Sequence, residues 1–181
     1  MKILFFCVGS ALLILVSRTS LTHPRSHGFY RFFAWEFMWL LLLTNVSHWF
    51  KNPFSFYQII SWTLLFASAG LALYGFYQFR RMGQADSIRK DAVILDFEKT
   101  TVLITTGLYQ YIRHPLYGSL LLLTWGIFFK RLTWFGLAWA CLATLFLFLT
   151  AWREEEENLA YFGPAYRDYM KRSKRFIPFL F

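Results

Sequence analysis

Residues 116–152 read LYGSLLLLTWGIFFKRLTWFGLAWACLATLFLFLTAW, a stretch that is almost entirely apolar. Lys130 and Arg131 divide it into two apolar runs, Leu116–Phe129 and Leu132–Trp152. A two-residue connection between such runs predicts a tight antiparallel helical hairpin. The second run is long enough to cross a membrane core of about 30 Å as a helix. The first has 14 residues, fewer than the about 20 that a straight span needs, so it is either partly re-entrant or extended by the preceding polar residues.

Three more apolar runs precede the hairpin, at Ile3–Ser17, Phe32–Phe50 and Phe54–Phe79. No small-x-small cleavage pattern follows the first run, so we interpret it as a span rather than a signal peptide. The chain of 181 residues is 57% hydrophobic and contains 22 Phe, more apolar surface than a soluble core of this size hides. We therefore predict a single all-α integral membrane domain of about five transmembrane helices, with three N-terminal spans in residues 3–79 and a loop, helical hairpin and tail in residues 80–181.

The distribution of basic residues predicts the orientation in the membrane. With five alternating spans, 15 of the 19 Lys and Arg fall in the loop 18–31, the loop 80–115 and the tail from residue 153. Such a bias marks the cytoplasmic side, so the N-terminus is predicted outside and the C-terminus in the cytoplasm. The formal net charge of +9 is then explained by anionic lipid headgroups, because no nucleic-acid-binding motif is present.

The longest polar loop, residues 83–106, is predicted to be an ordered cytoplasmic cap. Its β-prone stretches Val93–Leu95 and Val102–Ile104 predict a short strand. Cys7 and Cys141 lie inside apolar runs without a metal-ligand spacing, so we predict neither a disulfide nor a metal site.

The residues before the hairpin form the first candidate site. Pro115 suits the first position of a helix, since its missing N–H would be unpaired there. Arg113 and His114 would then lie at the positive end of that helix, where a carboxylate or phosphate is favoured. The alternative is that these two side chains only anchor the helix to lipid headgroups.

The run Glu154–Glu157 after the hairpin forms the second candidate site. Carboxylates at the negative end of a helix are unfavourable, so the run is either a solvated extension of the helix or a ligand site. In the second case we expect Glu154 and Glu155 to face the bundle, while Glu156 and Glu157 face water. The topology places this run and Arg113-His114 on one face, where together they could hold a zwitterionic ligand.

These two blocks resemble the isoprenylcysteine carboxyl methyltransferase and phospholipid methyltransferase superfamily. Residues 103–118 read Leu-x-x-x-Gly-x-Tyr-x-x-x-Arg-His-Pro-x-Tyr-Gly, and the tail repeats the family's pattern at Glu154-Glu155, Leu159, Phe162-Gly163, Tyr166, Tyr169, Arg175 and Pro178. The resemblance implies a methyltransferase that uses S-adenosylmethionine, with the cofactor site on the cytoplasmic face. It implies Gly107, Tyr109, Arg113, His114, Pro115, Tyr117, Glu154 and Glu155 as cofactor-binding residues, and Arg153 and Glu155 as catalytic residues.

The resemblance also implies a lipophilic acceptor that enters from the bilayer, most like the carboxyl group of an isoprenylcysteine. A phospholipid amine and a small thiol remain alternatives, and Gly70 and Gly75 replace the Gly-x-Gly of the phospholipid-methylating branch. Membrane sterol reductases, which use NADPH, have a similar His-Pro-x-Tyr turn and are a different enzyme class. A membrane scaffold without enzymatic activity is a third possibility, and the sequence leaves the oligomeric state open.

Overall fold

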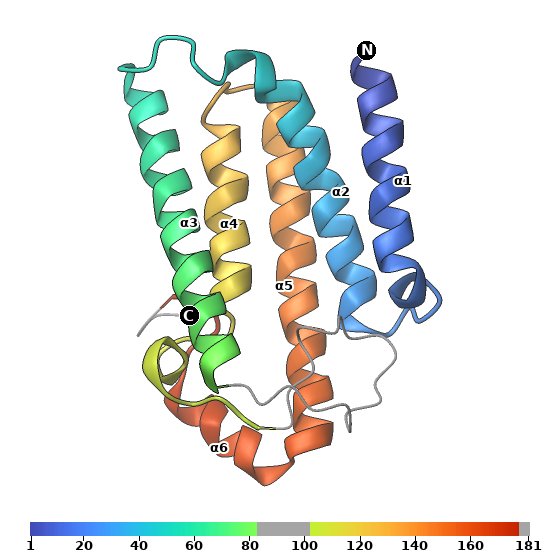
Figure 1. The fold of residues 1–181 in the computed structure, drawn as a ribbon, viewed down its shortest axis with the longest axis vertical. Helices are drawn as coiled ribbons and strands as arrows, with labels where there is room; N and C mark the ends of the chain where they lie inside the picture. Colours follow the sequence, from blue (N-terminus) through green and yellow to red (C-terminus); the bar gives the residue numbers. More distant parts are fainter. Residues whose placement is uncertain (83–101, 178–181) are drawn as a thin grey trace.

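Five bundle helices alternate in direction in the computed structural model, which describes residues 1–82 and 102–177 (Figure 1). They are α1 (Lys2–Leu21), α2 (His27–Asn45), α3 (Phe56–Met82), α4 (Pro115–Phe128) and α5 (Trp134–Phe162). The short helices are η1 (Val46–His48), η3 (Gly107–Gln110) and α6 (Pro164–Arg172). We call the end of the bundle that carries η3 and α6 the α6 end, and the end that carries η1 and the α4–α5 turn the hairpin end. The all-helical fold and the hairpin are as predicted.

The helices carry their apolar side chains outward as well as inward. By length and composition, α1, α3 and α5 are suited to cross a membrane, whereas α4 is a shorter apolar helix. Leu12, Phe66 and Leu73 are 58%, 70% and 74% exposed. Exposing such apolar side chains to water is unfavourable, whereas exposing them to lipid tails is not. This surface is therefore that of an integral membrane protein.

Two helix boundaries differ from the apolar runs. Helix α2 begins five residues before Phe32, because the Ser26 hydroxyl accepts a hydrogen bond from the Phe29 N–H (3.2 Å) and caps the helix. Helix α5 continues ten residues past Trp152, through all four glutamates. It ends at Gly163, and α6, which the sequence analysis did not predict, begins at the next residue.

The predicted strand is only partly within the described residues. Val93–Leu95 lies outside them, and the prediction for Val102–Ile104 was wrong, because these residues form no strand. Across residues 1–82 and 102–177, the β-type pairing is an isolated parallel bridge between Ile112 and Lys174.

Short polar side chains fix α4 against its neighbours. Asn45 on α2 donates to the carbonyl of Ile127 (2.8 Å). On α3, Ser61 and Ser68 lie two turns apart and donate to the carbonyls of Gly126 (2.6 Å) and Ser119 (2.7 Å). Hydrogen bonds of this kind hold helices together where the surroundings offer no water. These hydrogen bonds fix the position of α4 along the axis of the bundle, and therefore also the position of the residues that precede Pro115.

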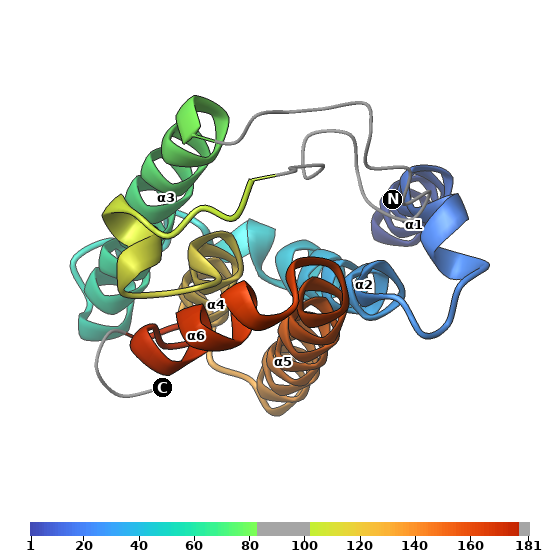
Figure 2. The same ribbon diagram turned by 90° about the horizontal axis from the view of Figure 1, so that it is seen from below.

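The packing leaves α1 at the edge and covers the α6 end of α4 and α5. Helix α2 packs mainly on α5, and α3 on α4, while α1 lies against α2. Seen from below, α6 crosses beneath α4 and α5 (Figure 2). The residues that resemble the methyltransferase superfamily therefore lie together at one end of the bundle.

Candidate active site

The turn that leads into α4 is fixed by the last turns of α3. Gly107 has φ +63°, a conformation that side chains other than glycine rarely adopt. The side chain of Gln78 lies directly against Gly107, and its Oε1 accepts a hydrogen bond from the Leu108 N–H (2.8 Å). Gly107 therefore has a structural role, which is to let η3 approach α3.

We expect Gly107→Ala to destabilise the protein. A Cβ atom at this position would lie 1.9 Å from Gln78 Nε2, and the positive φ adds backbone strain of about 1–3 kcal/mol. The expected result is a lower Tm in detergent. Gly70→Ala is the matched control, because no atom lies within 4 Å of a Cβ atom there. An equal Tm for both variants would contradict the role assigned to Gly107.

The tail after α6 is joined to the residues before α4 by backbone hydrogen bonds. The N–H groups of Arg113 and His114 donate to the carbonyls of Lys174 (2.8 Å) and Arg175 (3.1 Å), and the Lys174 N–H donates to Tyr111 (2.8 Å). The Tyr169 hydroxyl donates to the Tyr109 carbonyl (2.5 Å). Burial raises the pKa of Tyr169, so this donor keeps its proton. The two blocks of the sequence pattern are thus one structural unit.

Glu155 is the centre of a buried charge cluster in this unit. Its side chain is 3% exposed, and its carboxylate accepts hydrogen bonds from Arg113 Nε (2.8 Å) and from Arg175 Nη2 (2.5 Å). Arg113 Nη1 also donates to the carbonyl of Ser173. One carboxylate and two guanidinium groups leave one positive charge in excess. The cluster fastens α5 to the start of α4 and to the tail.

His114 is the cap residue of α4 and lies beside this cluster. Its Nε2 atom lies 3.4 Å from Glu155 Oε1, yet it is buried without a hydrogen-bond partner among the described residues. Its Nδ1 atom lies 3.8 Å from Glu154 Oε2, beyond hydrogen-bond distance. A buried polar atom in this state is suited to a further partner.

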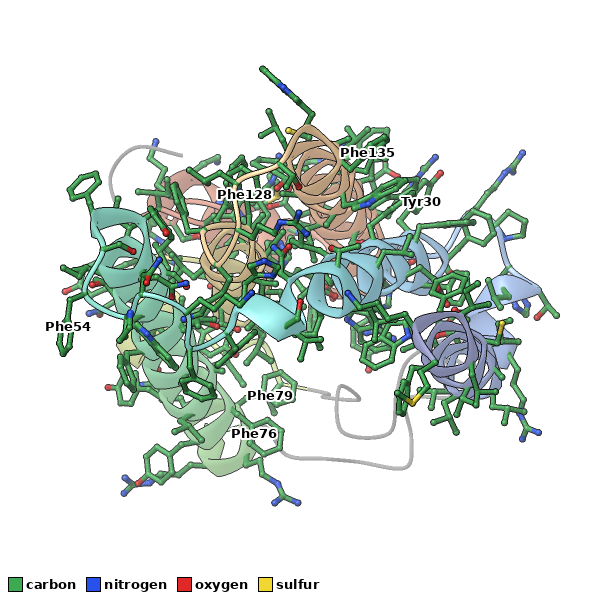
Figure 3. The ribbon with its side chains drawn as sticks, turned by 90° about the horizontal axis from the view of Figure 1, so that it is seen from above. Tyr30, Phe54, Phe76, Phe79, Phe128 and Phe135 are labelled. Atoms are coloured by element: carbon green, nitrogen blue, oxygen red, sulfur yellow. The ribbon has the colours of Figure 1, made fainter. Side chains whose placement is uncertain are left out.

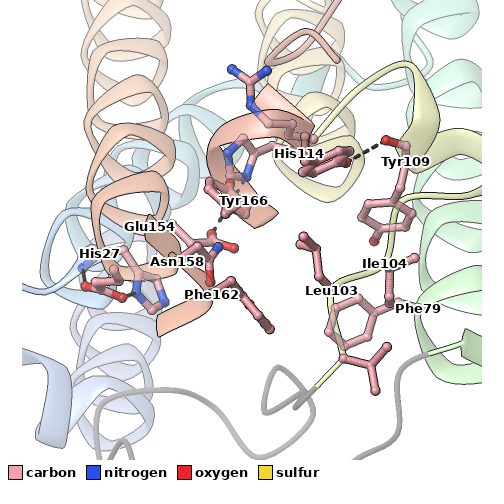
Figure 4. Close-up of a pocket in the computed structure, with 14 residues that line it drawn as sticks. His27, Phe79, Leu103, Ile104, Tyr109, His114, Glu154, Asn158, Phe162 and Tyr166 are labelled. Atoms are coloured by element: carbon pink, nitrogen blue, oxygen red, sulfur yellow. Dashed lines mark hydrogen bonds and ion pairs between the residues drawn. The ribbon is translucent and has the colours of Figure 1, made fainter. Parts of the chain in front are cut away.

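Glu154 lines a cavity of about 90 Å³ at the α6 end, which we call the polar cavity because its lining includes His27, Arg113, His114, Glu154, Glu157 and Asn158. Glu157, Asn158 and Phe162 follow Glu154 at helical spacing and line the same cavity. Figure 4 shows Glu154, Asn158 and Phe162 on one side of this cavity, with Phe79, Leu103, Ile104 and Tyr109 on the other.

The expectation that Glu157 faces water was wrong. Its Oε1 accepts from the His27 N–H (2.9 Å), and its Oε2 lies 2.5 Å from His27 Nδ1. The His27 N–H belongs to the first turn of α2, where backbone donors have no partner within the helix and a negative charge is favoured. This interaction ties the start of α2 to the cavity wall.

A second, mainly apolar cavity of about 450 Å³ adjoins the polar one. That volume is within the range of about 300–1,000 Å³ that ligand pockets occupy. The residues that line it but not the polar cavity lie on α2, α3 and α4, and they are Arg31, Trp35, Ala72, Leu73, Phe76, Pro115, Leu116, Tyr117, Ser119 and Leu120. The two cavities share Phe79, Tyr109, Arg113, His114 and Glu154. We call these five residues the common wall.

The structure distributes the predicted site residues over four environments. Tyr109, Arg113, His114 and Glu154 belong to the common wall, and Pro115 and Tyr117 line the apolar cavity. Gly107 and Glu155 lie behind these surfaces and line neither cavity. Arg153 lies on another side of α5, where its Nη1 donates to Glu156 Oε2 (2.6 Å) and its guanidinium stacks 4.7 Å from the Trp152 ring.

The sequence analysis missed His27, Phe79 and Asn158, which line the polar cavity. It quoted Phe162, Tyr166 and Tyr169 in the tail pattern without assigning them to the site, and it expected Glu157 to face water. Helical spacing could have identified Glu157, Asn158 and Phe162, because they follow Glu154 by three, four and eight residues on one helix and so lie on the same face. His27 could not be found in this way, because it lies at the other end of the chain.

Comparison with known proteins places this arrangement in a family. Methanethiol S-methyltransferase from Crocosphaera subtropica is 32% identical over 76 residues, which are 42% of this chain and 29% of that enzyme. The alignment therefore spans less than a third of the length of that relative. No solved structure matched the chain. The sequence model of the phospholipid methyltransferase family matches residues 63–163, from α3 to the end of α5. Because this match covers more than half of the chain and contains the common wall, the chain belongs to the phospholipid methyltransferase family.

Proposed function

We propose that this protein transfers a methyl group from S-adenosylmethionine to the anionic end of a lipophilic acceptor. The observation that carries the proposal is the common wall, at which a polar and an apolar cavity meet. One chamber has the polar groups that a charged cofactor needs, and the other has room for an aliphatic chain. The reacting groups of two such ligands would meet beside His114 and Glu154.

The side chains of the polar cavity fit the chemistry of S-adenosylmethionine. The cofactor carries an ammonium group, a sulfonium group, a carboxylate, ribose hydroxyls and an adenine ring. Glu154 and Asn158 offer acceptors for the ammonium or the hydroxyls, and Phe79 and Phe162 offer ring faces for a cation or for adenine. The cofactor is larger than the polar cavity alone, so it would extend into the space along the common wall.

The cationic groups of the apolar cavity favour an acceptor that arrives as an anion. Arg31 is 3% exposed and lines this cavity together with Arg113, whereas Glu154 is the one carboxylate among its described lining residues, so the guanidinium groups outnumber the carboxylate. A carboxylate or thiolate is attracted by these charges, whereas a protonated amine is repelled. The carboxyl group of an isoprenylcysteine combines such an end with an apolar chain, so it is our leading candidate.

The chain's own contribution to the rate would be positioning and exclusion of water. When bound, S-adenosylmethionine supplies a methyl group activated by its sulfonium. A carboxylate or thiolate acceptor needs no general base, since it is already deprotonated. The protein would hold the cofactor and the acceptor in a fixed orientation, so that they need not meet by chance in solution. This positioning supplies much of the acceleration of methyl transfer. The apolar walls formed by Leu73, Phe76 and Leu116 keep water from the acceptor.

A small thiol is the second candidate acceptor. The named relative acts on methanethiol, and 76 residues of this chain align with it. A thiolate would meet the same positive charge as a carboxylate, but it would leave most of the apolar cavity unused. The two candidates differ in the size of the acceptor, which a direct comparison can test.

We expect purified protein in detergent to bind S-adenosylmethionine and to methylate an isoprenylcysteine analogue. The measurement is titration calorimetry for the cofactor, and transfer of a radiolabelled methyl group to an isoprenylcysteine analogue, methanethiol or phosphatidylethanolamine. Methylation of methanethiol alone would favour the second candidate. Binding of NADPH without binding of S-adenosylmethionine would favour the reductase class. Folded protein that binds neither cofactor would contradict an enzymatic role for the two cavities.

A further inference from the structure

The hairpin end of the bundle contains a third cavity, far along the helices from the common wall. It has a volume of about 320 Å³ and lies between η1, the start of α3 and the α4–α5 turn. Its lining residues are His48, Lys51, Asn52, Tyr57, Gln58, Lys130, Arg131 and Leu132. Nothing in the proposed methyl transfer uses these residues.

Most of the basic residues at the hairpin end line this cavity. Only four of the 19 Lys and Arg were assigned to this end from the sequence, and three of them, Lys51, Lys130 and Arg131, line this one cavity. No carboxylate lines it, and no ion pair joins these three side chains to a carboxylate within residues 1–82 and 102–177. Three cations held together without an anion repel one another.

The ammonium group of Lys130 is buried without a carboxylate partner among the described residues. Lys130 is 1% exposed, and its Nζ donates to Gln58 Oε1 (3.1 Å) and lies 3.4 Å from the centre of the Trp62 ring. The Trp49 ring also lies near, 5.2 Å from Nζ to its centre. An ammonium group has three donors, so a neutral amide and two ring faces compensate only part of its charge. Burial lowers the pKa of Lys130 to about 8, the direction expected of a cation without a counterion.

The cavity is held in shape by Gln58, which is fully buried. Its Nε2 donates to the carbonyls of His48 (3.2 Å) and Lys130 (3.2 Å). It therefore joins η1, α3 and the α4–α5 turn, the three elements that form the walls. A site that is shaped before its ligand arrives loses less entropy on binding.

Large aromatic side chains surround the same end. Phe54, Trp134 and Phe135 are 90%, 86% and 76% exposed, and Figure 3 shows Phe54 projecting outward from the bundle. Among these, an exposed Trp at the end of a span, such as Trp134, is typical of the membrane–water interface. From the position of Trp134 at this end we place the cavity at the depth of lipid headgroups.

From the charge, the buried ammonium and the position, we infer that this cavity binds a phosphate group, supplied by an anionic phospholipid headgroup or by free phosphate. The Arg131 guanidinium is suited to two oxygens of such a group, and the Lys51 and Lys130 ammonium groups to further oxygens. The inference is independent of the proposed methyl transfer, because the two sites lie at opposite ends of the bundle.

The test is thermal unfolding of full-length protein in an uncharged detergent, with short-chain phosphatidylglycerol, short-chain phosphatidylcholine or inorganic phosphate added. At a concentration about tenfold above Kd, the ligand should raise the Tm by about 3 to 6 °C. Arg131→Gln and Lys51→Gln should each weaken the effect about tenfold in ligand concentration, since each removes a charge-assisted hydrogen bond. Both residues are exposed, so these variants keep their fold. Lys130→Met tests the buried ammonium.

Lys171→Gln is the matched control, because it removes one exposed positive charge at the α6 end. A Tm shift with phosphatidylglycerol alone would identify a lipid headgroup site. A shift with both phosphatidylglycerol and inorganic phosphate would identify a phosphate site that does not require the lipid. Either result supports the inference if Arg131→Gln loses the shift and Lys171→Gln retains it. No shift with either anion, or an equal shift in all variants, would overturn it.

Discussion

Replacing Glu155 by glutamine is expected to lower the Tm of the purified protein by about 6 to 12 °C. The substitution keeps the shape of the side chain but removes the negative charge that Arg113 and Arg175 share. Removing one partner of a buried ion pair costs about 3–5 kcal/mol, because the remaining charge stays buried. We use about 3 kcal/mol, since Arg175 is 24% exposed and water compensates part of the loss. For a chain of this size, 1 kcal/mol corresponds to about 2–4 °C.

The matched control for this substitution is Glu156→Gln. Glu156 is the next residue of α5 and also pairs with an arginine, but its side chain is 45% exposed. Exposed pairs contribute about 0–1 kcal/mol, so the Tm should change little. The measurement is the unfolding midpoint of both variants in the same detergent. If Glu155→Gln and Glu156→Gln have the same unfolding midpoint, the carboxylate of Glu155 does not hold the cluster together.

Replacing Glu154 by glutamine is expected to weaken the binding of S-adenosylmethionine about 10- to 100-fold. Glu154 lines both cavities, and a hydrogen bond between its carboxylate and a cationic or hydroxyl group of the ligand is worth about 1.5–3 kcal/mol. The Tm without ligand should stay close to that of the wild type, because Glu154 is outside the cluster around Glu155. The measurement is titration calorimetry with the cofactor.

Glu156→Gln again serves as the control, since it removes the same charge from a part of α5 that faces neither cavity. It should bind the cofactor as the wild type does. Equal affinity in Glu154→Gln and the wild type would remove Glu154 from the proposed cofactor site. A loss of affinity in Glu156→Gln as well would show that the helix responds to net charge rather than to a specific contact.

The separation of roles between Glu154 and Glu155 was not predictable from the sequence. Both were expected to face the bundle, and both do, but adjacent positions on a helix are about 100° apart and meet different neighbours. Glu155 meets Arg113 and Arg175, whereas Glu154 meets the cavities. Which carboxylate receives the arginines depends on the course of the tail after α6, and no local pattern specifies that course.

The membrane class, the alternation of the helices and the common end of the two motifs were predictable from the amino-acid sequence. Apolar run lengths and the positions of Lys and Arg carry this information, because the bilayer imposes it on each segment separately. Only the tertiary structure decided that Arg113 is engaged by Glu155, that Glu157 joins His27, and that Lys51, Lys130 and Arg131 meet at the opposite end. The physical reason is that these contacts join residues far apart in the chain. Their geometry depends on how the helices pack, and the periodicity of a single helix does not contain it.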